Sequence, residues 1–405
     1  MGAGPAGACL ALLLARSAAV EVTLVEAQAD LRRQLRGEGL MPSGLEVLER
    51  IGWSPLPATI PQRELQGWTF LVEGTVLFRA EEPMGSPHAC TLIDQGSLLA
   101  SLVEGAEQQG AQVLKGQAVA QLLEEQGRIC GVRLVDGQER RADLVIGCDG
   151  RDSSLRRLAQ LEFPRTERPI DVLWFRLSGP ESLPLVRWLA GRFVTVVGAA
   201  GSFALFETVS GAVQLGWWAL QAPLPEPAQA WPARWAGACS APLADLLAAI
   251  TPEHIEGPVR LPVRVGLLER WHRPGLLLLG DAAHPMSPVR AQGINMALRD
   301  AFVAAGELIR GLPSLSTPWD PAQIDVLLER ITQLRIPEIR TIQGLQAREL
   351  ERAQLLHRNP WLRRLLSAGA SFWGPLLARR WIRDQRQLRE GLPLREGLPL
   401  PGGPP

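Results

Sequence analysis

Residues 276–295 bring together the groups with the clearest chemical potential in the chain. Four leucines predict a short strand buried on both faces, and Gly280 and Asp281 then place a carboxylate just past its carboxyl end. In open α/β sheets, ligands bind at that end of the strands. From Gly293 the apolar residues recur at helical spacing, so a helix N-terminus with unpaired N–H groups meets the same place. The stretch predicts a site for a ligand that is, or becomes, anionic; for the Gly-Asp pair alone, an ordinary strand–loop–helix connection is the alternative.

A second ligand-binding pattern opens the chain. Gly2, Gly4 and Gly7 follow the spacing G-x-G-x-x-G, an apolar helix comes next, and the following strand ends at Glu26. This is the dinucleotide-binding fingerprint, in which the glycines let the backbone approach a pyrophosphate and the acid binds a ribose diol. The fingerprint ordinarily follows a buried strand, and here only Met1 stands before it. We expect that the true start lies upstream; the alternative is a sheet without its central strand.

Two other stretches carry side chains suited to a nucleotide. Arg36 stands beside a glycine in a polar segment and is placed to contact a phosphate, with a solvated charged loop as the alternative. A buried strand over 142–148 ends in Asp149 and Gly150 and opens a helix. This is a second acid at a strand end, although such turns are common in α/β proteins.

Composition narrows the classes of function. The chain has 405 residues and a net charge of zero, so a nucleic-acid partner has no electrostatic support. Its five cysteines show no C-x-x-C spacing, which favours a reducing compartment and indicates neither a disulfide framework nor a metal site. We find no signal peptide and no run near the roughly 20 apolar residues that span a bilayer, and therefore expect a cytoplasmic protein. Tyrosine is absent, which removes one candidate acid–base.

Strand patterns divide the chain into two kinds of region. Residues 112–134 predict a meander of three strands with turns between them. Further along, strand-like runs with turn residues predict a mostly antiparallel sheet inserted between two parts of an α/β domain. These runs cover residues 171–177, 193–197, 203–209 and 213–219.

Three motifs resemble, in the same order, those of the FAD-dependent group A aromatic monooxygenases of the p-hydroxybenzoate hydroxylase type. They are G-A-G-P-A-G at 2–7, C-D-G at 148–150 and G-D-A-A-H-P at 280–285, the most specific of the three. The resemblance covers roughly residues 2–310 and implies an α/β fold: a Rossmann-like FAD-binding domain, an inserted mostly antiparallel β-sheet substrate domain and a helical C-terminal region. The expected boundaries are 1–70, 94–165 and 263–345 for the FAD-binding domain, 71–93 and 166–262 for the substrate domain, and 346–388 for the C-terminal region.

The resemblance also implies which residues bind FAD. The glycines of the first motif and Glu26 would bind the ADP half. Arg36 and Gln95 would lie near the phosphates and the ribityl chain, to which Asp281 would form a hydrogen bond. Asp149 would belong to a motif associated with both FAD and NAD(P)H. The full set is Gly2, Gly4, Gly7, Glu26, Arg36, Gln95, Asp149, Gly150, Gly280, Asp281, Gly293, Ile294 and Asn295.

The turn before Gly293 carries the candidate catalytic residues, Pro288 and Arg290. Backbone N–H groups of residues 293–295 would face the pyrimidine end of the flavin, where the reduced ring gathers negative charge. Arg290 stands where the family usually has glycine. We expect its guanidinium either to bind an anionic substrate or to turn outward.

The implied activity is hydroxylation of a small aromatic or quinone-like substrate, with NADH or NADPH as co-substrate and a flavin hydroperoxide formed from dioxygen. Two alternatives stay open: an FAD-dependent reductase or dehydrogenase of the same superfamily, and a flavin-binding protein without turnover. Because the chain lacks tyrosine, a phenolic substrate would need His88, His272, an acid or water to ionise its hydroxyl. Both histidines are more often surface or packing residues.

Residues 361–388 interleave tryptophans with arginines at helical spacing. Such a basic helix lies on a membrane surface in some proteins, which would make this one a peripheral membrane protein, and packs on its own domain in others. Residues 389–405 repeat R-E-G-L-P-L and predict a disordered tail. Nothing in these patterns indicates an oligomeric state.

Overall fold

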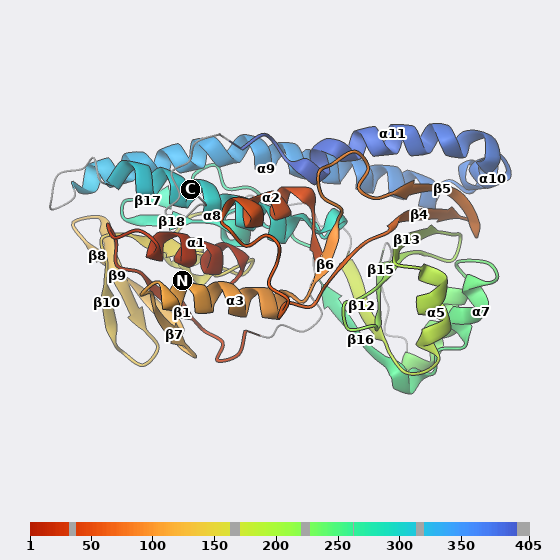
Figure 1. Cartoon of the computed structure of the whole chain (residues 1–405), viewed down its shortest axis with the longest axis horizontal. Coiled ribbons are helices and arrows are strands. Elements are labelled where there is room, and N and C mark those ends of the chain that lie inside the picture. Colours follow the sequence, from red (N-terminus) through yellow and green to blue (C-terminus); the bar gives the residue numbers. More distant parts are fainter. Residues whose placement is uncertain (32–37, 163–170, 220–226, 262, 313–319, 395–405) are drawn as a thin grey trace.

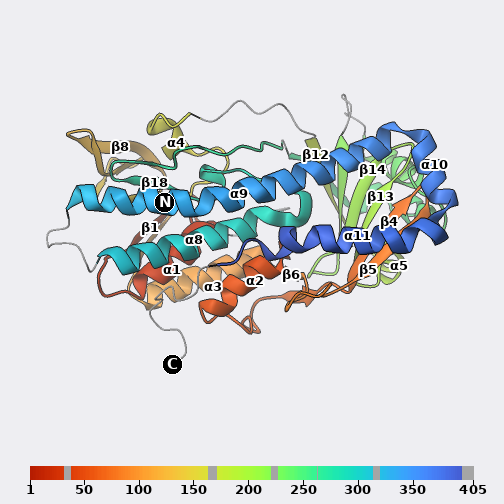
Figure 2. The ribbon, with the colours of Figure 1, turned by 90° about the horizontal axis from the view of Figure 1, so that it is seen from above.

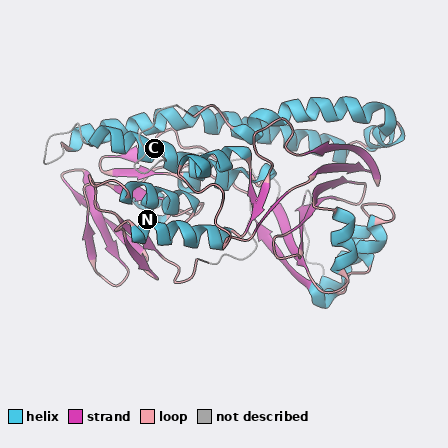
Figure 3. Ribbon diagram, viewed as in Figure 1, coloured by secondary structure: helices cyan, strands magenta, loops and turns pink. Residues whose placement is uncertain are grey.

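The computed structural model describes residues 1–31, 38–162, 171–219, 227–261, 263–312 and 320–394. Arg36 and residues 395–405 therefore lie outside the described residues. The chain forms two lobes with their own sheets, and long helices run along one side of both (Figure 1, Figure 3). This arrangement confirms the predicted α/β fold with an inserted antiparallel sheet and a helical C-terminal region.

The first lobe contains two pairs of parallel strands. β1 (Thr23–Glu26) pairs with β7 (Gln112–Lys115), and β11 (Val145–Gly147) pairs with β18 (Leu276–Leu278). The meander expected over 112–134 is therefore wrong in its first strand. A helix precedes β7 and returns it parallel to β1, as a parallel crossover requires. The other two predicted strands belong instead to an antiparallel sheet of β8 (Val119–Glu125), β9 (Arg128–Leu134) and β10 (Glu139–Arg141).

The first residues of the chain connect these two pairs of strands. The N–H of Gly2 donates to the carbonyl of Val25 at 2.7 Å, and the carbonyl of Met1 accepts the N–H of Cys148 at 2.7 Å. The ends of β1 and β11 consequently meet where the first helix begins, at Pro5.

Three helices give this lobe a rigid core. α1 (Pro5–Ala15) is apolar on every side and packs between α3 (Gln95–Gln108) and α8 (Gln292–Gly311). A helix with apolar residues all round belongs in a core. Packing along most of its length holds α8 in place. It thereby fixes the N-terminal end of the helix, which the sequence places at the ligand.

The second lobe is a seven-stranded sheet, antiparallel except where β4 (Gly67–Val72) runs parallel to β13 (Arg192–Val197). The domain boundary expected at residue 70 falls inside β4, which joins this sheet whole. One face carries α5 (Ser182–Leu189) and two short helices, α6 (Trp231–Ala236) and α7 (Leu243–Ala248). The strands are, in order, β16 (Ile255–Leu261), β12 (Asp171–Leu177), β15 (Val213–Ala219), β14 (Ser202–Glu207), β13, β4 and β5 (Thr75–Glu81).

The C-terminal helices cover the other face of the sheet. α9 (Pro321–Arg358) runs from one lobe to the other, and α11 lies beside its second half (Figure 2). The boundary expected between residues 345 and 346 therefore falls within one continuous helix. The single helix expected over 361–388 is two helices, α10 (Pro360–Ala368) and α11 (Ala370–Glu390), because the chain turns back at Gly369.

The tail expected to begin at residue 389 starts as ordered structure. Arg389 is 2% exposed and forms an ion pair with Glu82. The N–H of Leu392 donates to Glu338 at 2.8 Å. Residues 389–394 thus pack on the body of the protein, which corrects the sequence prediction for that segment. Among the described helices, none is long and apolar enough to cross a membrane.

Candidate active site

The N-terminal fingerprint adopts the geometry that its glycines permit. Gly2 has a φ of +89°, and a Cβ there would lie 2.5 Å from the carbonyl oxygen of Cys148. A Cβ on Gly7 would lie 1.9 Å from the carbonyl oxygen of Gly2. Glu26 is buried and accepts the N–H groups of Ala3 at 2.6 Å and Gln28 at 2.9 Å. The glycines, the acid and the start of α1, whose N-cap is Gly4, therefore meet at one place.

Two acceptor atoms fit a bound group with hydroxyl donors. Oδ2 of Asp149 accepts from Ser154 Oγ and from the N–H of Leu155. Oδ1 of Asp149 and Oε1 of Gln95 are buried without a hydrogen-bond partner among the described residues. Buried acceptors of this kind normally have a partner. A dinucleotide such as FAD carries the ribose and ribityl hydroxyls that would supply the donors.

Asp281 lies beside the first turn of α8. Its Oδ1 is 3.8 Å from the position that a Cβ on Gly293 would occupy, and the side chain is 26% exposed. Its neighbour Gly280 has a φ of +60°, which lets the chain turn sharply out of β18. The carboxylate therefore faces the place where Gly293 and Ile294 have N–H groups at the helix start.

A fully buried charge network fixes the G-D-A-A-H-P motif from below. His284 contacts Asp300 at 2.5 Å, and the same carboxylate accepts the N–H of Gly280 at 2.9 Å. Arg335 donates to the other Asp300 oxygen at 2.7 Å. Burial acts to raise the pKa of Asp300, but the His284 and Arg335 side chains outweigh it and lower that pKa below its usual value. His284 is thus a positioning residue rather than an acid–base facing a ligand.

Asn295 joins the start of α8 to β2 (Gly39–Leu40) and to the residue that caps α2 (Pro42–Arg50). Its Oδ1 accepts the N–H of Met41 at 2.8 Å, and its Nδ2 donates to the carbonyls of Ala291 at 2.7 Å and Gly39 at 3.3 Å. All of these bonds are buried or partly buried. The side chain therefore positions the helix N-terminus, and its backbone alone is available to a ligand.

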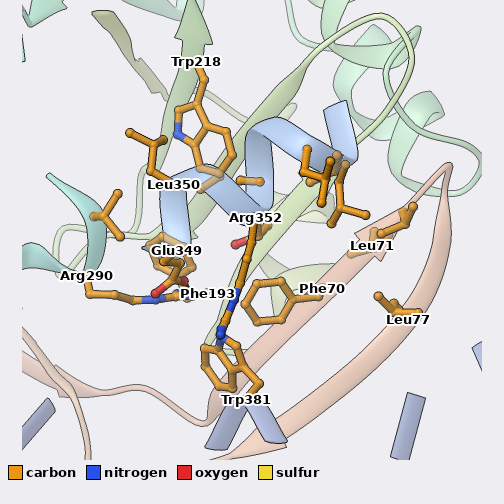
Figure 4. Close-up of a pocket in the computed structure, with 18 of the residues that line it drawn as sticks. Phe70, Leu71, Leu77, Phe193, Trp218, Arg290, Glu349, Leu350, Arg352 and Trp381 are labelled. Carbon is orange, nitrogen blue, oxygen red and sulfur yellow. Dashed lines mark hydrogen bonds and ion pairs between the residues drawn. The ribbon is translucent and has the colours of Figure 1, made fainter. Parts of the chain in front are cut away.

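The turn before α8 is strained at the residue that departs from the family. Arg290 and Ala291 have φ values of 59° and 49°, in the left-handed region that non-glycine residues rarely adopt. The Arg290 side chain points inward and forms an ion pair with Glu349 (Figure 4). Its guanidinium carbon lies 4.5 Å from the centre of the Trp68 ring and 4.9 Å from that of the Trp381 ring. It does not turn outward, the second of the two expected orientations.

A row of polar side chains on α9 holds the same turn. The Gln343 amide donates to the carbonyls of Gly266 and Pro285 at 2.8 and 3.3 Å. One turn later, the Gln346 amide donates to the carbonyls of Ser287 and Val289 at 2.9 and 2.6 Å. Glu349, a further turn along, receives Arg290. Residues spaced three apart lie on one face of a helix, so α9 braces the whole turn. No pattern in the sequence over 321–358 indicated this role.

A pocket of about 550 Å³ opens beside the turn, between the sheet and the C-terminal helices. Its walls are mainly aromatic and aliphatic, and the Arg290–Glu349 pair adds charge on the side of the turn (Figure 4). Pro288 also lines it. The pocket brings Pro288 and Arg290 together with aromatic residues that the sequence did not single out: Phe70, Phe78, Trp174, Phe193, Trp218 and Trp381.

Comparison with known proteins agrees with this geometry. Residues 1–313 match the FAD binding domain family. The chain is 36% identical over 331 residues to the 6-methylpretetramide 4-monooxygenase of Streptomyces rimosus, covering 77% of this chain and 75% of that protein. It is 28% identical over 383 residues to a 3-amino-4-hydroxybenzoate 2-monooxygenase of Streptomyces platensis, covering 88% of this chain and 87% of the relative. The solved structure of p-nitrophenol 4-monooxygenase from Pseudomonas putida has the same fold, with a TM-score of 0.74 at 17% identity over 97% of this chain and 98% of that one.

The chain therefore belongs to the FAD binding domain family. It is an FAD-dependent oxidoreductase of the aromatic monooxygenase type, as the three motifs imply.

Proposed function

We propose that this protein uses NADH or NADPH and dioxygen to hydroxylate a polycyclic aromatic substrate. The observation that carries the proposal is the apolar pocket next to the turn that the family places at the flavin. Aromatic walls favour flat aromatic ligands, and the volume is in the range of pockets that hold drug-sized molecules. The relative from Streptomyces rimosus is named for 6-methylpretetramide, which supports a large aromatic substrate.

Bound FAD would supply the oxygen-activating chemistry at this site. The backbone N–H groups of Gly293 and Ile294 would stabilise negative charge at the pyrimidine end of the flavin. Pro288 and Arg290 would form the wall between flavin and substrate. The apolar lining would exclude water and protect reactive species from hydrolysis.

Two measurements on the purified full chain test this proposal. The first is a visible absorption spectrum, in which flavin bands at near-stoichiometric intensity are expected. The second supplies 1,8-dihydroxyanthraquinone with NADPH or NADH under air and follows product by mass spectrometry with ¹⁸O₂. Incorporation of one labelled oxygen supports the monooxygenase. Oxidation of the nicotinamide without labelled oxygen in the product supports the reductase alternative, and flavin bands without any turnover support a flavin-binding protein without turnover.

We further propose that the hairpin of α10 and α11 contacts an anionic membrane surface. Its outer face exposes Trp361 at 79%, Phe372 at 67% and Leu365 at 60%. The arginines Arg364, Arg379 and Arg383 are exposed on the same two helices. Tryptophan and arginine together suit the boundary between lipid headgroups and acyl chains. The inner face of this hairpin lines the pocket, so a lipophilic substrate would enter close to the membrane.

Co-sedimentation of the full chain with vesicles tests this contact. Vesicles containing phosphatidylglycerol should bind the protein, and binding should weaken with added salt and in neutral phosphatidylcholine. The double variant Trp361→Ser and Phe372→Ser should lose most of the binding. Val326→Ser, at a side chain 67% exposed on α9, is the matched control. Equal binding of both variants, or none by the unmodified chain, contradicts the contact.

A further inference from the structure

Glu38 lies between the turn over residues 285–291 that precedes α8, called the flavin turn below, and the seven-stranded sheet of the second lobe, called the substrate sheet. The next residue, Gly39, accepts a hydrogen bond from Asn295, and a Cβ on Gly39 would lie 3.2 Å from the Cβ of Ala291. On its other side, Oε2 of Glu38 accepts the N–H of Val209, just beyond β14, at 3.4 Å. The carboxylate therefore stands between the two elements that enclose the reacting groups in the proposed function.

The sheet presents a polar patch at this junction. Trp174 of β12 and Gly216 of β15 line the pocket, and side chains two residues apart on a strand share a face. Arg176 and Gln214 thus continue the same face, and they stand opposite each other in the ladder between β12 and β15. Both amide atoms of Gln214 are fully buried and have no hydrogen-bond partner within the described ranges.

Charged groups from several elements surround Glu38. Arg176 approaches from β12, Arg63 from β3 (Gln62–Glu64) and Asp94 from the cap of α3. Arg63 is itself ion-paired with Glu207 of β14. Burial raises the pKa of Glu38 to about 7, against smaller opposing effects of the Val209 N–H and the Arg176 guanidinium. A carboxyl group with a pKa near the working pH is suited to proton transfer.

The other acid–base groups anticipated from the sequence lie elsewhere. His88 contacts Glu49 at 3.1 Å on the surface of α2 (Pro42–Arg50). His272 is 3.4 Å from Glu329 on the far side of β18, and burial lowers its pKa. Among the described residues, no histidine lines the pocket. Arg176 and Gln214 are not lining residues either, but they continue the sheet face of Trp174 and Gly216, which are.

We propose that Glu38 is the base that ionises a phenolic substrate, and that Arg176 and Gln214 bind the oxygen that becomes negative. The substrate O–H bond breaks, its electron pair stays on oxygen, and the proton moves to the Glu38 carboxylate. The phenolate directs electrophilic oxygen to its ring more strongly than the neutral phenol does. Partly exposed, Glu38 then releases the proton to solvent. This assignment rests on the proposed function, because it requires a phenolic substrate.

An infrared titration tests the base without any substrate. The difference spectrum between the unmodified holoprotein and Glu38→Gln should contain a protonated carboxyl band that disappears near pH 7. Glu64→Gln, at an exposed position on the neighbouring strand, is the matched control and should leave the band that disappears near pH 7 in place. A Glu38 band that disappears in the ordinary carboxyl range overturns the assignment, whatever the protein hydroxylates.

A bound phenol tests the role itself. The oxidised holoprotein at pH 7 should bind 1,8-dihydroxyanthraquinone with the visible spectrum of its phenolate, and Glu38→Gln should bind the neutral form. In turnover, Glu38→Gln should lower kcat/KM by about 100-fold at pH 7 and remove the rise with pH, whereas Glu38→Asp should restore most of both. Gln214→Met should raise the pH at which the bound phenol ionises.

The two proposals fail in different ways. If the unmodified protein hydroxylates the probe and Glu38→Gln keeps the same pH profile, the proposed function stands and the base is wrong. If the infrared band disappears near pH 7 but no labelled oxygen enters the probe, the activity is wrong for this substrate class. Phenolate bound equally by both proteins overturns the base directly.

Discussion

Two clusters of charge contact the stretch from Gly280 to Asn295, and they are built in opposite ways. Below the stretch, Asp300, His284 and Arg335 are buried, and the Asp300 carboxylate contacts both of the other side chains. Beside it, Arg290 and Glu349 line a pocket. In the lower cluster, Asp300 and Arg335 stand inside regular helices, whereas Arg290 requires a backbone conformation that costs about 1–3 kcal/mol.

The two clusters differ in their roles: the Asp300 cluster stabilises the fold, whereas the Arg290–Glu349 pair faces the pocket. In the lower cluster Asp300 accepts from the His284 ring, the Arg335 guanidinium and the N–H of Gly280, so it holds the strand end and the helix start in place. A strained residue that keeps its charge at a pocket wall is a common feature of functional sites. We therefore expect substitutions in the lower cluster to act on stability, and those in the pocket cluster to act on substrate binding as well as on stability.

The largest effect should follow from Asp300→Ala. It leaves Arg335 without one of its two carboxylates and frees the N–H of Gly280 in the core. Breaking a buried ion pair in this way costs about 3–5 kcal/mol of unfolding free energy. Urea unfolding followed by tryptophan fluorescence measures the loss. Asp152→Ala, which breaks an exposed ion pair with Arg264, should change the unfolding free energy by no more than about 0.5 kcal/mol. Equal losses in the two variants would show that the buried Asp300 cluster does not stabilise the fold more than an exposed pair does.

Glu349→Ala should come next, because it leaves Arg290 charged and unpaired at 6% exposure. We expect a loss of about 2–3 kcal/mol and a higher KM for the aromatic substrate. Arg290→Gly should cost less stability, since it also relieves the positive φ, while raising KM about tenfold. Urea unfolding and steady-state kinetics on the two variants and their double form a mutant cycle. An unchanged substrate range and turnover in Arg290→Gly would remove the binding role of that side chain.

The Glu38 carboxyl group should make the stability of the folded protein depend on pH. Because its folded-state pKa is raised to about 7 from 4.5, the folded protein holds the proton more tightly than the unfolded chain does. The resulting stabilisation is complete below about pH 4.5 and is lost as the pH rises through 7. Glu38→Gln should therefore leave stability unchanged near pH 4 and increase it by about 3 kcal/mol near pH 8. Thermal unfolding at both pH values measures this, and a variant less stable at pH 8 would contradict it.

The smallest effects should come from the glutamines of α9. Gln343→Leu and Gln346→Leu each remove hydrogen bonds to the flavin turn and should lower the unfolding free energy by about 1 kcal/mol. They should also increase NADPH oxidation that yields no product, because the turn is held less firmly. Gln333→Leu, which removes a bond only to Glu329 within the same helix, is the control and should leave both values unchanged.

Short contiguous motifs are the part of this protein that its sequence determined. The glycines at 2–7, the acid at Glu26 and the strand–turn–helix around Asp281 are local patterns, and the structure forms them where the spacing requires. A glycine with positive φ or an acid at a strand end is fixed by its neighbours in the chain. That is why the fold class and the cofactor were predictable from these residues.

Only the tertiary structure decided how the substrate side is built. Arg290 meets a carboxylate 59 residues away on α9, and Glu38 meets the backbone of Val209 across 171 residues. No periodicity marks such partners, because a helix face or a strand end reveals its neighbour only once the whole sheet has formed. The sequence therefore left the polar segment around Glu38 open between a phosphate contact and a solvated loop, and it indicated no partner for α9. Long-range packing gave both of them surroundings that sequence spacing alone does not contain.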